Sequence, residues 1–130
     1  MSELAARRWV LRLDGMPPSP NARLHYMARA RSAKHWRQLA ALTAQREHVP
    51  PMPRVRVSAV LTRRRLGLAD EDNDRARVKP IVDGIVDAGV ISRDTRGHVE
   101  WGDVTEQRGA PGVVLIVEDA SDSPAAEGWR

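Results

Sequence analysis

The sequence of 130 residues has no cysteine and no phenylalanine, and its aromatic side chains are 4 Trp and 1 Tyr. Without cysteine, disulfides and thiolate-bound zinc are excluded, which fits a reducing cytoplasm. No apolar run approaches the roughly 18 residues of a membrane span, and the N-terminus has no recognisable signal peptide. We therefore expect no membrane partner.

Charge is divided unevenly along the chain. Residues 1–69 contain 14 Lys and Arg against 3 Asp and Glu, whereas residues 70–130 contain 7 against 14. A basic half attracts polyanions such as nucleic acid, and an acidic half tolerates phosphate only when cations neutralise its carboxylates. The split suits a protein that grips DNA with one part and holds a divalent metal with another. Uneven but solvated surface charge is the simpler alternative.

Apolar residues at alternate positions predict β-strands over residues 8–14 and 55–63, and residues 98–107 and 112–118 are expected to form two final strands. A first helix is expected from an N-cap at Ser32 to about Glu47, and a second helix is expected to end at about Ala88. Residues 64–74 are polar and charged and are expected to form an ordered loop.

The expected order of elements is therefore β-α-β-α-β-β. Such an order predicts an α+β fold, in which two helices pack on a four-stranded mixed sheet. Pro80 either opens the second helix or kinks it. Residues 1–118 are expected to form one domain, and residues 119–130 a flexible tail.

The stretch Asp70-Glu71-Asp72-Asn73 is the most informative part of the chain for chemistry. In an extended segment residues two apart project to the same side, so Asp70 and Asp72 can converge on one cation. Asp94, from another element, can complete that site or bridge two metals, and Mg²⁺ prefers such hard oxygen ligands. The alternative is that this stretch only closes a turn and caps the next helix.

Lys79 follows Asp72 by about two helical turns if the helix is continuous between them. In that case it can face the carboxylates and touch a scissile phosphate or a metal-bound water. Asp83 lies four residues after Lys79, so an ion pair within the helix is the alternative, and both roles are compatible.

Two segments together resemble the RusA-type Holliday junction resolvases, a family common in phages and prophages. Residues 17–21 (PPSPN), between the first strand and a basic helix, resemble the family's N-terminal signature. Residues 70–73, then residues 79–91 (KPIVDGIVDAGVI) and Asp94, resemble its catalytic region. Two differences from the family pattern are Arg93 in place of the first acid of a pair and a longer segment between Asn73 and Lys79.

The resemblance implies that Asp70, Asp72 and Asp94 bind Mg²⁺, for which Mn²⁺ can substitute, and that Lys79 is the essential lysine. It also implies a homodimer that cuts two opposed strands of a four-way DNA junction, a substrate with matching two-fold character.

Basic residues near the predicted site are expected to bind DNA phosphates, with little readout of base sequence. They belong to the end of the second strand and to the first helix: Arg63, Arg64, Arg65, Arg29, Arg31, Lys34 and Arg37. A nucleic-acid-binding module without catalysis and a protein-interaction domain are the two other hypotheses.

Overall fold

The computed structural model describes residues 7–18, 25–65, 71–91 and 98–120, and the side chains of residues 71–73 are not among what it describes. The elements in chain order are β1 (Arg8–Asp14), α2 (Tyr26–Arg46), β2 (Val55–Arg63), α3 (Glu71–Asp87), β3 (Val99–Arg108) and β4 (Gly112–Asp119). This order and the α+β class confirm the prediction.

The four strands form one mixed sheet in the order β1-β4-β2-β3. β4 pairs antiparallel with both β1 and β2, whereas β2 and β3 run parallel. Parallel neighbours need a crossover connection, and α3 supplies it between β2 and β3. Because β2 and β3 are parallel, their ends lie at the same edge of the sheet. The start of α3, which follows β2, lies near this edge.

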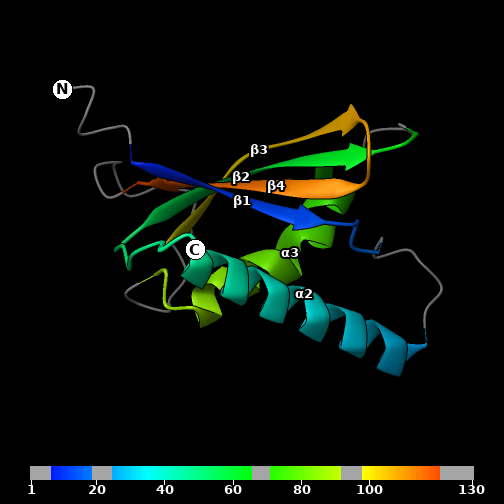
Figure 1. The fold of residues 1–130 in the computed structure, drawn as a ribbon, viewed down its shortest axis with the longest axis horizontal. Helices are drawn as coiled ribbons and strands as arrows, with labels where there is room; N and C mark the ends of the chain where they lie inside the picture. The colour runs from blue at the N-terminus through cyan, green and yellow to red at the C-terminus, as the bar shows by residue number, and fades with distance from the viewer. Residues whose placement is uncertain (1–6, 19–24, 66–70, 92–97, 121–130) are drawn as a thin grey trace.

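Both helices pack on one face of the sheet and against each other (Figure 1). Alternate residues of each strand point into the core between the two layers, as the period of two in the sequence predicts. Most of the largest fully buried side chains come from three strands and α3, and they include Leu11, Leu61, Leu115, Ile81 and Ile85. From α2 the core receives Trp36, Ala40 and Ala44.

The two helices cross very closely at Gly84. A Cβ atom at this position would lie 2.3 Å from the backbone oxygen of Arg37 and 2.7 Å from the Cβ of Ala40. Because real atoms do not approach that closely, only glycine allows this crossing. The α2–α3 contact thereby fixes the direction of α3 under the sheet.

Three predicted boundaries were wrong. α2 begins at Tyr26 rather than after Ser32, because the imidazole of His25 caps it by accepting a hydrogen bond from the Met27 N–H at 3.2 Å. α3 begins at Glu71, inside the segment predicted as a loop, and it continues through Pro80. β4 ends at Asp119, one residue beyond the predicted end of that strand, and Ala120 after it is buried.

Candidate functional site

One of the three predicted metal ligands lies at the start of α3. Asp72 occupies the first turn of this helix, so the prediction that Asp70 and Asp72 share an extended segment was wrong for Asp72. Asp70 and Asp94 lie outside the described residues, and so does the side chain of Asp72. Their convergence on one ion therefore stays a prediction.

Asp74, two residues further along α3, is the only buried charged residue in the described part of the chain, with 4 % of its surface exposed. It points at the sheet, where its carboxyl group shares a hydrogen bond with Glu106 of β3. Two carboxyl groups can share a hydrogen bond only when one of them holds a proton. Burial is the largest cause that raises the pKa of Asp74 to about 6, and the hydrogen bond and charge of Glu106 raise it further. The charges of Arg77 and Arg63 oppose the shift.

Two arginines complete this buried charge cluster, which we define as Arg63, Asp74, Arg77 and Glu106. Arg63 Nη1 lies 3.1 Å from Glu106 Oε1, and Arg77 Nε lies 3.9 Å from Asp74 Oδ1. Burial, followed by the neighbouring charge of Arg63, lowers the pKa of Arg77. The cluster joins α3 to β2 and β3, so it fixes the first turns of the helix to the end of the sheet.

Arg77 also links α3 to the segment that follows β1. Its Nη1 donates a hydrogen bond to the carbonyl oxygen of Pro17 at 3.0 Å, across sixty residues of sequence. Pro17 belongs to the proline-rich segment after β1, and Arg77 belongs to the helix whose first turn contains Asp72. The two segments are therefore neighbours in the fold.

Sequence reasoning missed this cluster because residues 64–74 were expected to form a loop. Had the helix start been placed at Glu71, the spacing of Asp74 from Val78, Ile81 and Ile85 would have put it on the buried face. A carboxylate on that face requires a partner, which is the signal that could have found it.

Lys79 pairs with Asp83 on the exposed side of α3, which confirms the predicted alternative of an ion pair within the helix. The Lys79 side chain is 59 % exposed. An exposed pair of this kind contributes little to stability and exchanges readily with other partners. A role of Lys79 at the metal site stays a prediction.

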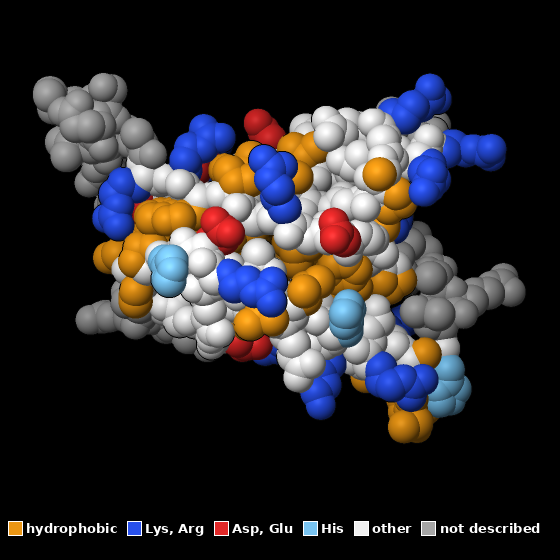
Figure 2. Space-filling view, in the orientation of Figure 1, with side chains coloured by type: hydrophobic (Ala, Val, Ile, Leu, Met, Phe, Trp, Pro, Cys, Tyr) orange, Lys and Arg blue, Asp and Glu red, His pale blue; other side chains and the backbone are white. Residues whose placement is uncertain are grey.

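Basic side chains gather at the end of the sheet where β2 ends (Figure 2). Arg64 and Arg65 are exposed there, whereas Arg63 is engaged by Glu106. Arg63 therefore holds the buried charge cluster together, and Arg64 and Arg65 are the better placed of the three for contact with phosphate.

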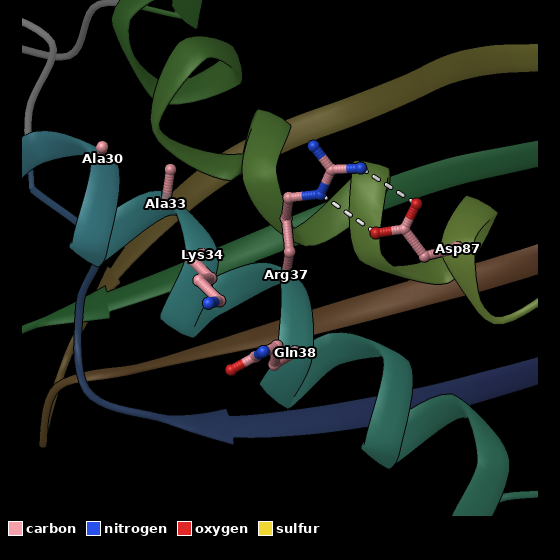
Figure 3. A pocket seen from close by; sticks show the side chains of 6 residues that line it. All are labelled: Ala30, Ala33, Lys34, Arg37, Gln38 and Asp87. Atoms are coloured by element: carbon pink, nitrogen blue, oxygen red, sulfur yellow. Dashed lines mark hydrogen bonds and ion pairs between the residues drawn. The ribbon is translucent and has the colours of Figure 1, made fainter.

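A second basic surface follows α2, which contains no acidic residue. Its basic residues Arg29, Arg31, Lys34 and Arg37 are all exposed. Arg37 makes two hydrogen bonds to Asp87 of α3, at 3.0 and 2.9 Å, and this pairing raises its pKa (Figure 3).

An open hollow of about 450 Å³ lies beside this pair, between α2 and the end of α3 (Figure 3). Ala30, Ala33, Lys34 and Gln38 line its α2 side. Small side chains flanked by cations leave room for an extended anionic chain. Of the two cations that line the hollow, Arg37 is paired with Asp87, so Lys34 is the one available to an anionic group.

The donor chemistry at the start of α3 fits a hard divalent cation, because the three predicted ligands are all aspartates. Asp74 and Glu106 do not fit that role, since they bind each other and two arginines. Across residues 7–18, 25–65, 74–91 and 98–120 no three His, Cys, Asp or Glu side chains are grouped as metal ligands would be.

Comparison with models of known protein families finds no match to this chain, and comparison with curated proteins finds none either. Of the helices in the described residues, neither is long and apolar enough to cross a membrane.

Proposed function

We propose that this chain is a magnesium-dependent, structure-selective endodeoxyribonuclease that resolves four-way junctions and related branched DNA by phosphodiester hydrolysis. Its resemblance to the RusA-type resolvases motivates the proposal. The cytoplasm of a bacterial host, where such DNA arises, is the location that this activity requires.

One observation supports the proposal most strongly. α3 begins within the Asp70-Glu71-Asp72-Asn73 sequence, and its first turns are fixed to the end of the sheet by a buried charge cluster. Catalytic carboxylates must be held within a fraction of an ångström of their working positions, and rigid surroundings provide this. A turn that served only to cap a helix would need no such support.

The residues of the chain divide into three tasks under this proposal. Asp70, Asp72 and Asp94 hold the metal, and Lys79 approaches the scissile phosphate after exchanging its bond to Asp83. Arg64 and Arg65 bind phosphates next to the cut, where the charge of the DNA would otherwise oppose the approach of the carboxylates. Arg77 and Asp74 position the start of α3 and do not touch the DNA.

Bound Mg²⁺ supplies activation of the attacking water and neutralisation of the charge that develops on the phosphate. Mn²⁺ has similar ligand preferences and substitutes for it. We further propose a homodimer, because two identical sites related by a two-fold axis match the two opposed strands of a junction.

Cleavage of a synthetic four-way junction tests the proposal. Wild-type protein with Mg²⁺ is expected to cut two opposed strands, whereas Asp72→Asn is expected to bind the junction and leave it intact. Asp103→Asn, at an exposed position on β3, is the matched control and should cut as wild type does. Equal cutting by wild type and Asp72→Asn would remove the metal role of Asp72. Junction binding without cutting in either metal would favour a catalytically silent binding module.

A further inference from the structure

The first ten residues of α2 extend past the core. Trp36, whose ring lies 3.6 Å from where a Cβ on Gly15 would be, is the first buried side chain of the helix. None of residues 26–35 is buried, and ten helical residues span roughly 15 Å. In Figure 1 this part of α2 reaches beyond the end of β1. A helical segment with no buried side chain gains little stability from packing, so a projection of this kind points to a partner.

Two aromatic rings stand at the tip of this projection. We define the α2 tip as His25 and Tyr26, whose ring centroids are 4.6 Å apart with an angle of 34° between their planes. Tyr26 is 74 % exposed, the most exposed large hydrophobic side chain of the described residues. The bond from the Met27 N–H to Nδ1 holds the His25 ring in place. The tip is therefore a fixed aromatic platform facing solvent.

The charge around the α2 tip indicates what covers it. α2 contains Arg29, Arg31, Lys34 and Arg37 in its first half and no acidic residue over its whole length. Figure 2 shows histidine, hydrophobic and basic side chains together at this end of the molecule. Cations that track a phosphate backbone, combined with rings on which bases stack, are the recurring combination in proteins that bind unpaired nucleic acid.

We propose that the α2 tip stacks on the base pairs at the branch point of the DNA, where the continuous stack of base pairs is interrupted, while Lys34 and the adjoining hollow follow the phosphates of one arm. The proposal rests on the proposed function insofar as it takes branched DNA as the partner. It adds a source of selectivity, because a linear duplex offers phosphates to α2 but no exposed base to the tip. A second copy of this chain is the alternative occupant, and the uniform positive charge of α2 argues against pairing with another α2.

Binding of the full chain to an immobile four-way junction, compared with a linear duplex of equal length, tests this inference. EDTA prevents cleavage, and 2-aminopurine beside the branch point reports stacking. Tyr26→Leu is expected to weaken junction binding about ten-fold, to abolish the 2-aminopurine response and to leave duplex binding unchanged.

Three matched variants separate stacking from charge and from folding. Tyr26→Phe keeps the ring and should behave as wild type. His25→Asn keeps an N-cap without the ring, so it should retain helicity and lose part of the junction preference. Lys34→Ala should weaken junction and duplex binding alike, because a phosphate contact does not distinguish them.

Wild-type junction affinity in Tyr26→Leu would overturn the inference, as would an equal loss on junction and duplex. Sedimentation velocity tests the alternative in which a second copy of this chain covers the α2 tip. The inference would also be overturned if Tyr26→Leu dissociated a wild-type dimer and junction binding fell in proportion. The result is separable from the nuclease proposal. A wild-type protein that shows the stacking pattern but never cuts in Mg²⁺ refutes the nuclease and supports the α2 tip.

Discussion

Substitution of Asp74 by asparagine is expected to change how stability depends on pH. The folded state raises the pKa of Asp74 from 3.8 to about 6, chiefly because the carboxyl group is buried and bonded to Glu106. The folded state therefore holds this proton more tightly than the unfolded chain does. The resulting stabilisation is fully present below pH 3.8 and is lost as the pH rises through about 6.

The size of the effect follows from the shift. About two pKa units at roughly 1.4 kcal/mol each give about 3 kcal/mol for Asp74. In Asp74→Asn the amide donates a hydrogen bond to Glu106 without carrying a charge at any pH. The variant should therefore not show the loss of stability that wild type shows as the pH rises.

Urea unfolding in EDTA, repeated between about pH 4 and pH 7, measures this directly. The free energy of unfolding of wild type minus that of Asp74→Asn should fall by up to about 3 kcal/mol over this range. Asp83→Asn changes an exposed carboxylate on the same helix and is the control, with no comparable change. Parallel profiles for wild type and Asp74→Asn, or a difference that grows with pH, would refute the reasoning.

Three further predictions address packing, catalysis and charge. Gly84→Ala should lower the free energy of unfolding by roughly 1–3 kcal/mol in urea, because its Cβ would clash with Arg37 and Ala40; increased stability would contradict the close crossing. Lys79→Met should keep the stability of wild type but cut junctions about 100-fold more slowly, and unchanged cutting would leave Lys79 only its ion pair with Asp83. For DNA binding, the slope of log K against the logarithm of the salt concentration should become shallower by about 1 in Lys34→Ala. An unchanged slope would show that no phosphate binds there.

The strands could be predicted from sequence because the sheet presents one buried face. In β2, for example, Val55, Val57, Ala59 and Leu61 are all buried and alternate with residues that are not. A period of two survives in the sequence only when one face is packed, and here the helices pack it. The order of elements and the α+β class followed from this pattern.

The helix starts could not be placed in the same way. His25 caps α2 through its ring, whereas sequence rules favour small polar side chains such as Ser32. The first turn of α3 is charged, and Asp74 in that turn is buried. Apolar periodicity therefore begins only at Val78, two turns after the helix does.

The buried charge cluster depends on contacts between residues far apart in the sequence. Asp74 meets Glu106 only because β3 returns parallel to β2 at the edge of the sheet, and Arg77 meets Pro17 across sixty residues. Local patterns do not contain this information. The acidic motif could be recognised in the sequence, whereas the residues that hold the start of α3 in place are brought together only by the fold.

A crystal of the protein soaked with Mn²⁺ and measured at the manganese absorption edge tests the central claim most directly. We predict an anomalous peak at the start of α3, about 2.0–2.3 Å from carboxylate oxygens of Asp70, Asp72 and Asp94. A peak elsewhere, or Asp94 distant from the other two aspartates in every subunit, would contradict the metal-dependent nuclease.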